Sequence, residues 1–398
     1  MQNFKYINKV YQHRYLNLLL IGIFFNVAIL SKKNKMNTIT RNKILYACKK
    51  YMQKCLKGVL LNNNSKIFSQ NFKISAVVPV YNCEKTIKAT IRSIQNQNMA
   101  DIEIILVNDN SKDNTSKIIQ QLAEEDRRII ILNNGKNMAT LYSRNIGILY
   151  SKGKYIMNID NDDLFMNADL FDIIYKEAET NNFDLIGFSA VESETYYPLI
   201  KEIKESRFHS HKNGLVVYQP ELTYFVISVN GKYSLNDLHV WGRLTKTNLY
   251  KNAINHFGKN SLGELRNSCF VTWHEDSAMS MAIFRYAKSY KFIQKYGIFH
   301  YMSNITSSHT SSSDLKIYGE LFFLDSIFDF SHNNIQGKKY LEQHLQLVIF
   351  NHNFNLYNEK NVKYLKAIFQ KMLSSKYISI ECKKIIIKKL NTFNIIKI

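Results

Sequence analysis

Three carboxylates lie within four residues at Asp160-Asn161-Asp162-Asp163, directly after an apolar run that ends at Ile159. Like charges this close repel one another and shift each other's pKa values unless a cation neutralises them. Oxygen ligands with no His or Cys beside them favour Mg²⁺ or Mn²⁺ over Zn²⁺. On its own, the segment fits both a metal site and a solvated acidic turn that caps the next helix.

Polar residues also follow two earlier apolar runs. Val80-Tyr81-Asn82 ends the first, and Asn108-Asp109-Asn110-Ser111 ends the second. A carboxylate held in the second turn can accept hydrogen bonds from a base or a ribose. Three such segments in order weigh against the acidic-turn interpretation.

The elements that carry these segments alternate between strand and helix. Short apolar runs bounded by turn residues predict strands, and amphipathic stretches between them predict helices. The strands are Ile74–Val80, Ile102–Val107, Ile129–Leu132 and Tyr155–Ile159, and the helices are Glu84–Gln97, Thr115–Asp126 and Met138–Tyr150. The alternation predicts an α/β fold with a mostly parallel sheet flanked by helices. Ligands bind at the carboxyl ends of such strands, where the polar segments lie.

The ordered set of segments resembles the family 2 glycosyltransferases, which have the GT-A fold. The other matching pieces are Ser143-Arg144-Asn145-Ile146-Gly147-Ile148, Trp241-Gly242-Arg243-Leu244 and His274-Glu275-Asp276. The resemblance implies an inverting enzyme that moves a sugar from a nucleotide-sugar, in particular a UDP-sugar, to an acceptor hydroxyl. It also implies Mn²⁺ or Mg²⁺ as the cofactor, and a glycan, lipid or protein as the acceptor.

The resemblance assigns the nucleotide site to the first two segments. Tyr81, between Pro79 and Asn82, would stack on the nucleobase, and Asp109 would bind the base imide. Two neighbours of Asp109 depart from the family pattern, because Asn108 stands where Asp is often found and Asn110 where Gly is common. Asn tolerates the left-handed conformation that this turn can require, so we expect the turn to be retained.

The resemblance assigns the phosphates and the metal to the later segments. Arg144 would lie near the ribose or the phosphates, Asp160 would contact the nucleoside, and Asp162 would hold the metal that bridges the pyrophosphate. His300 either completes the metal shell or is an ordinary histidine of the core or surface.

Asp276 matches the family's general base. A carboxylate that takes the proton of an acceptor hydroxyl typically contributes about 10²–10⁴-fold in rate. The alternative is a structural N-cap for the helix that follows, and Glu275 is the next candidate for the base. Trp241 could shape the acceptor site and Arg243 could reach the pyrophosphate, with core or surface positions as the alternatives. Two other functions stay open: an inactive homologue that binds a nucleotide-sugar, and a nucleotidyltransferase.

The basic residues concentrate at the two ends of the chain. The formal net charge is +21, and no acidic residue precedes Glu84. No nucleic-acid-binding motif accompanies this charge, so we expect no nucleic acid partner. The five cysteines form no CxxC pair, which argues against a disulfide framework or a structural zinc site.

The apolar run Tyr15–Leu30 would form a helix of about 24 Å, shorter than the roughly 30 Å hydrocarbon core of a bilayer. It is either a short single-pass membrane anchor, of a Golgi or ER protein for example, or an apolar helix of a cytoplasmic protein. We divide the chain into an anchor segment, a basic amphipathic helix with a linker that could contact a membrane surface, a glycosyltransferase domain and a helical C-terminal extension. Their ranges are 1–35, 36–70, 71–310 and 311–398.

Overall fold

The computed structural model describes residues 71–196, 204–206, 211–219, 222, 228–229, 232–233, 239–259, 274–302, 313–331, 341–342, 345, 359–376 and 378–392. The chain divides into two compact units, 1–70 and 71–398, and every described residue belongs to the second. The predicted anchor and basic helix lie outside the described residues and stay predictions. Within the described ranges, no helix has both the length and the apolar character that crossing a membrane requires.

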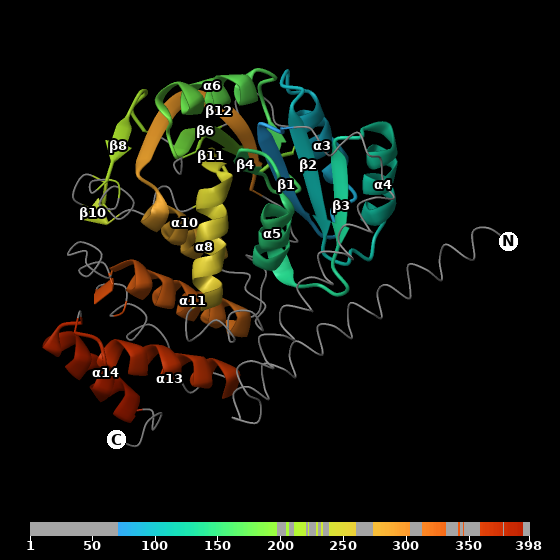
Figure 1. Cartoon of the computed structure of the whole chain (residues 1–398). Coiled ribbons are helices and arrows are strands. Elements are labelled where there is room, and N and C mark those ends of the chain that lie inside the picture. The colour runs from blue at the N-terminus through green and yellow to red at the C-terminus, as the bar shows by residue number, and fades with distance from the viewer. Residues whose placement is uncertain are drawn as a thin grey trace, which may run out of the picture. The chain divides into compact units, whose positions relative to one another are not determined.

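Four parallel strands form one half of the central sheet, in the order β3-β2-β1-β4 (Figure 1). They are β1 (Ile74–Val80), β2 (Ile102–Asn108), β3 (Ile129–Asn133) and β4 (Tyr155–Asn158). The helices between them are α3 (Ile87–Gln95), α4 (Thr115–Glu125) and α5 (Ala139–Tyr150). Every residue of β1 and β2 is buried, because helices cover both faces of the sheet. The predicted α/β fold is confirmed.

The other half of the sheet continues from β4 in the order β11-β6-β12-β5. Its strands are β5 (Leu164–Phe165), β6 (Leu185–Ser193), β11 (Arg243–Lys246) and β12 (Ser289–Tyr301), with β7 (Lys204–Glu205) on β6 and β8 (Val216–Tyr218) on β12. Strand β11 is antiparallel to β4 and β6, whereas β6 and β12 are parallel. Strands β9 (Ser228–Val229) and β10 (Lys232–Tyr233) pair separately.

The two faces of the sheet contribute to two separate hydrophobic clusters. Alternate residues of a strand point to opposite faces, so Val77 of β1 joins one cluster while Ala76 and Val78 join the other. Side chains of α3, α4 and α6 (Leu170–Asn181) complete the second cluster. The first cluster includes the C-terminal helices.

Those C-terminal helices are stacked in sequence order on one face of the sheet (Figure 1). Helix α10 (Glu275–Tyr286) packs between α8 (Thr247–Lys259) and α11 (Ser313–Ser331), α11 contacts α13 (Glu359–Leu373), and α13 contacts α14 (Ile380–Thr392). The last three helices lie in the predicted C-terminal extension, and they share the compact unit of the sheet. The two described cysteines, Cys83 and Cys382, are free and buried.

Helix α5 lies unusually close to the sheet at Gly147. A Cβ atom added there would lie 2.6 Å from Cγ1 of Val77 and 3.0 Å from Cγ2 of Val107. This close approach brings the preceding turn of α5, which carries Arg144, over the carboxyl ends of the strands.

We expect Gly147→Ala to lower the free energy of unfolding. Overpacking costs about 1–3 kcal/mol and alanine's better helix propensity returns less than about 1 kcal/mol, which leaves a net loss of about 1–2 kcal/mol. Gly135→Ala is the control, because nothing lies within 4 Å of its added Cβ. Urea unfolding of the two variants measures the difference, and equal stabilities would contradict the close approach of α5.

Candidate active site

The loops after β1 and β2 are joined by hydrogen bonds through Asn82. Its side-chain Oδ1 accepts from Lys112 N at 2.8 Å, and its backbone N donates to Ser111 Oγ at 3.1 Å. Asn82 and Asn110 both have positive φ, of 44° and 63°. The expectation that Asn110 allows the left-handed turn is therefore confirmed, since Asn is enriched in this conformation among non-glycine residues.

Asp109 is held in one orientation beneath this joined loop. Its Oδ1 accepts from Asn134 Nδ2 at 2.7 Å and from Met138 N at 2.8 Å, and its side chain is almost fully buried. Tyr81 lies at the end of the neighbouring strand and is 38% exposed, so its ring is accessible to a ligand. Asn134 is a site residue that the sequence analysis missed, because no pattern marks the residue after β3.

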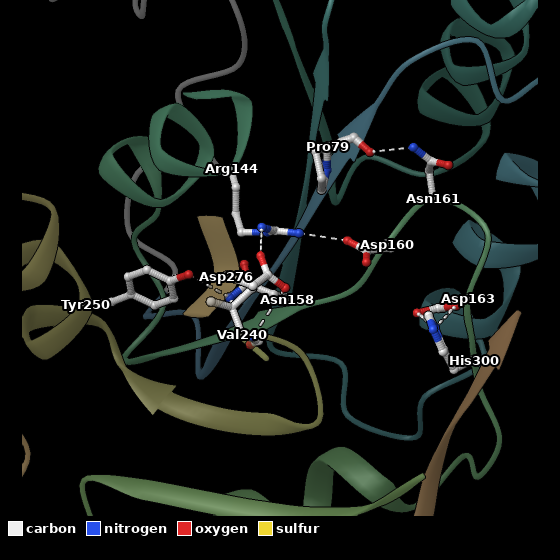
Figure 2. Close-up of polar contacts among 10 residues, drawn as sticks. All are labelled: Pro79, Arg144, Asn158, Asp160, Asn161, Asp163, Val240, Tyr250, Asp276 and His300. Carbon is white, nitrogen blue, oxygen red and sulfur yellow. Dashed lines mark hydrogen bonds and ion pairs between the residues drawn. The ribbon is translucent and has the colours of Figure 1, made fainter. Parts of the chain in front are cut away.

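The loop 160–163 is tied to the β1 edge through Asn161. Asn161 Nδ2 donates to the Pro79 carbonyl oxygen at 3.1 Å (Figure 2), and Thr86 Oγ1 donates to the Asn161 carbonyl oxygen at 2.9 Å. Pro79 therefore contributes its backbone oxygen to the position of the acidic loop. Its predicted contact with the donor stays a prediction.

The third carboxylate of the acidic cluster is engaged within the protein. Asp163 is fully buried, and its Oδ1 lies 3.0 Å from His300 Nδ1 (Figure 2). The same oxygen accepts from Tyr301 N at 3.1 Å. Burial alone would lower the pKa of His300, but Asp163, together with Asp160 and Asp162, raises it to about 9. Burial raises the pKa of the Asp163 carboxyl as well, so the two groups hold one proton between them at neutral pH, and the contact ties the acidic loop to β12.

Trp241 extends this cluster on the other side of His300. The two rings stack at 4.9 Å with an interplanar angle of 24°, and His239 lies 5.1 Å from the indole on a tilted plane. Trp241 is buried, so the contacts seen here are with protein side chains. Its predicted role in the acceptor site stays a prediction.

Arg144 is buried and binds two carboxylates from distant parts of the sequence (Figure 2). Its Nη2 donates to Asp160 Oδ1 at 2.8 Å, and its Nη1 donates to Asp276 Oδ1 at 2.5 Å. The other oxygen of Asp276, Oδ2, receives a longer contact of 3.5 Å from Val240 N. One guanidinium thus joins α5, the end of β4 and the start of α10. In this structure Arg144 orients the two carboxylates, and its predicted contact with the donor stays a prediction.

The charges around Arg144 are unevenly exposed. The Asp160 side chain is 31% exposed and that of Asp276 is 18% exposed, whereas Arg144 is 2% exposed. Burial alone would lower the pKa of Arg144, but Asp276 and Asp160 raise it well above its usual value. Glu275 lies next to this group, where burial and the Asp276 carboxylate raise its pKa. Of the two neighbouring carboxyl groups, Asp276 is the one in an ion pair with Arg144.

Arg243 lies inside the protein against α10. Its guanidinium contacts Ser280 Oγ and lies 5.0 Å from the centre of the Phe284 ring. The side chain is 2% exposed, so it helps to pack α10 onto β11. A contact with pyrophosphate is not seen in this position and stays a prediction.

The acidic loop offers oxygen ligands for a divalent cation. Asp162 is half-buried and follows Asp160 by two residues, while Asp163 is occupied by His300. No group of three His, Cys, Asp or Glu side chains in the described ranges is placed to hold a metal by itself. Mg²⁺ is usually bound through one or two carboxylates together with substrate phosphates. The residues present therefore fit a cation that binds with its substrate.

We expect Asp163→Ala to destabilise the protein more than Asp162→Ala. Removing the Asp163 carboxylate leaves Tyr301 N without its acceptor and lets the partly exposed His300 lose its proton, so we expect a loss of about 1–3 kcal/mol. A half-buried carboxylate in the same loop is expected to contribute less than about 1 kcal/mol. Chemical denaturation of both variants tests this, and similar losses would show that the His300 pair is not a special anchor of the loop.

The known proteins that this sequence matches are glycosyltransferases. Residues 75–251 match the family described as glycosyl transferase family 2. The uncharacterized glycosyltransferase EpsJ of Bacillus subtilis (strain 168) is 29% identical over 238 residues, which are 59% of this chain and 62% of EpsJ. The cholesterol galactosyltransferase of Borreliella burgdorferi is 25% identical over 268 residues, which are 65% of this chain and 70% of that protein. The matched part of EpsJ is therefore less than two thirds of its length.

Solved structures agree with the sequence comparison. Residues 1–349 of TarS from S. aureus, in complex with UDP-GlcNAc, match with a TM-score of 0.54 and 15% identity, over 80% of this chain and 85% of that one. At this identity the similarity shows the fold alone. Residues 75–251 therefore form a glycosyltransferase family 2 domain with the GT-A fold, as the sequence predicts.

Proposed function

We propose that this protein transfers a sugar from a nucleotide-sugar donor to an acceptor hydroxyl and releases the nucleoside diphosphate. The observation that carries the proposal is the Arg144 bridge, which holds Asp160 and Asp276 at the carboxyl edge of the sheet, where α/β folds bind ligands. An inactive homologue is disfavoured, because every carboxylate that the reaction needs is present: Asp109, Asp160, Asp162 and Asp276.

The donor that fits best is a UDP-sugar. An exposed aromatic ring at Tyr81 beside the fixed carboxylate of Asp109 suits a base that can stack and donate an imide hydrogen bond. TarS, which shares the fold, is described in complex with UDP-GlcNAc. Both points favour uridine diphosphate as the leaving group, with guanosine diphosphate as the second choice.

Asp276 is the general base of the proposed reaction. Its Oδ1 is held by Arg144 at 2.5 Å, whereas among the described residues Oδ2 has only the 3.5 Å contact with Val240 N, so we assign to Oδ2 the acceptor's proton. The acceptor oxygen then forms a bond to the anomeric carbon. The bond from that carbon to the diphosphate oxygen breaks, and its electron pair leaves with the diphosphate. A single displacement of this kind inverts the anomeric configuration.

A divalent cation would be held by Asp162, with Asp160 beside it. When bound, it would offset the negative charge that develops on the diphosphate. The positions of these two carboxylates depend on protein contacts, because Arg144 binds Asp160 and Asp163 anchors the loop to His300. Mn²⁺ and Mg²⁺ both suit carboxylate oxygens.

The acceptor is a hydroxyl of a glycan, a lipid or a protein. One relative is named a cholesterol galactosyltransferase, which makes a lipid hydroxyl a sensible first acceptor to test. Nucleotidyl transfer is the alternative within the enzyme class. It would consume a sugar-1-phosphate with a nucleoside triphosphate and release pyrophosphate, so analysis of the products separates the two reactions.

We expect the wild-type protein to release UDP from a UDP-sugar in the presence of Mn²⁺, and to stop doing so in excess EDTA. Asp162→Asn should lower this rate by roughly 10²-fold or more, since a bound cation is worth several kcal/mol of charge stabilisation. A panel of UDP-N-acetylglucosamine, UDP-glucose and UDP-galactose, with water as acceptor, allows the measurement before the acceptor is known. Full activity of the wild type in excess EDTA would contradict the metal site.

We expect Asp276→Asn to lower kcat by roughly 10²-fold or more with a near-normal KM for the donor. The N-cap of α10 is His274 rather than Asp276, and Asn keeps a side-chain oxygen that can accept from Arg144, so the fold of α10 should be retained. Glu275→Gln is the matched control, one residue earlier in the same turn, and we expect it to keep most of the activity. If Asp276→Asn keeps its kcat while Glu275→Gln loses it, the base is Glu275.

A further inference from the structure

The residue two positions before the proposed base has a strained backbone. His274 has φ 56° and ψ 13°, a left-handed conformation, and its carbonyl oxygen accepts the first hydrogen bond of α10 from Ala278 N at 3.0 Å. A left-handed residue other than glycine typically costs about 1–2 kcal/mol. Such strain persists only where the surrounding structure determines it. The contacts of His274 therefore decide where α10 begins.

Two of those contacts come from helix α11. The His274 ring stacks face to face on Phe323, with centroids 4.9 Å apart and planes inclined by 9°. His274 Nε2 lies 3.1 Å from Glu320 Oε1. Glu320 and Phe323 are three residues apart, so they lie on the same face of α11. Stacking on Phe323 thus fixes the plane of the His274 ring, and the contact with Glu320 fixes the position of its edge.

Helix α11 is itself rigidly held. Its residues from Leu321 to Phe328 are buried, and Asp325 and Asp329 both bind Lys371 of α13, at 2.9 and 2.6 Å. Asp325 is fully buried, so this charge pairing fixes the relative position of the two helices. Neither α11 nor α13 lies within residues 75–251, the part that matches the family. The contacts of His274 with Phe323 and Glu320 therefore come from the helical extension of this chain.

We infer that His274 is a positioning residue for Asp276, and that the C-terminal helices act on the reaction through its contacts with Phe323 and Glu320. The inference rests on the proposed role of Asp276 as the base. Asp276 lies in the first turn of α10, two residues after His274, so any rotation of that turn moves its carboxylate relative to Arg144. A displacement of about 1 Å can cost about 10²-fold in rate.

The decisive comparison is Phe323→Leu against Phe328→Leu. Both phenylalanines are buried in α11, but Phe328 lies beneath Lys371, at 5.1 Å, rather than against His274. We expect similar losses in melting temperature for the two variants. Only Phe323→Leu should lower kcat for UDP release from UDP-N-acetylglucosamine with Mn²⁺, by about 10-fold or more, with the donor KM within about twofold of wild type.

A second pair of variants changes His274 itself. This pair tests the inference even if Phe323→Leu does not fold. His274→Asn removes the ring, but Asn adopts the left-handed conformation readily. His274→Ala removes the ring and also introduces a residue that adopts this conformation less readily. We expect His274→Asn to retain several-fold more of the kcat than His274→Ala. The reverse order would overturn the inference.

Asp276→Asn is measured beside these variants to separate the inference from the proposed function. If Asp276→Asn is inactive while Phe323→Leu and His274→Ala keep the wild-type kcat, the positioning role is wrong and the base is retained. Equal losses of kcat in Phe323→Leu and Phe328→Leu would also overturn it, because general loosening of α11 would then be the cause. If Asp276→Asn keeps its kcat, the proposed base fails first, and the inference fails with it.

Discussion

The buried guanidinium of Arg144 is the interaction on which the rest of the site depends. A charge taken out of water is tolerated only where opposite charges compensate it, and here the two compensating carboxylates are Asp160 and Asp276. The same ion pairs bring together the loop after β4 and the first turn of α10. The ion pairs that compensate the buried guanidinium therefore also orient the Asp160 and Asp276 side chains.

The close packing of α5 on the sheet makes that interaction possible. Gly147 lets the helix approach Val77 and Val107, one turn after the arginine. On the far side of the site, Asp163 and His300 tie the acidic loop to β12, and Asn161 ties it to Pro79. The acidic loop is thus held from two sides by contacts within the protein. Among the candidate ligands, Tyr81 is exposed, whereas Asp160 and Asp162 are half-buried.

The C-terminal helices belong to the same physical arrangement. Helix α10 is buried on nearly all sides, between α8 and α11, so its position is set by helix packing as much as by the sheet. His274, whose backbone is left-handed, lies at the start of α10 and packs against α11. A part of the chain without recognisable chemistry therefore bears directly on where a reactive carboxylate lies.

The sequence by itself determined the local features of this protein. Buried strands follow from short apolar runs, and the left-handed turn at Asn110 follows from the tolerance of Asn for positive φ. The polar segments after the strands, in order and together with the pieces around Arg144, Trp241 and Asp276, carry the resemblance to the family. These signals are readable because each depends on residues close together in the chain.

Only the tertiary structure decided which partner each charged group takes. Asp163 pairs with His300, which lies 137 residues away, and Arg144 pairs with Asp276, which lies 132 residues away. Nothing in the sequence of the acidic segment distinguishes Asp163, which is fully buried against His300, from Asp162, which is half-buried. Arg243 and Trp241 likewise became buried only through packing against α10 and His300. The physical reason is that burial and ion pairing depend on distances across the sheet and between stacked helices, and local sequence patterns carry no information about those distances.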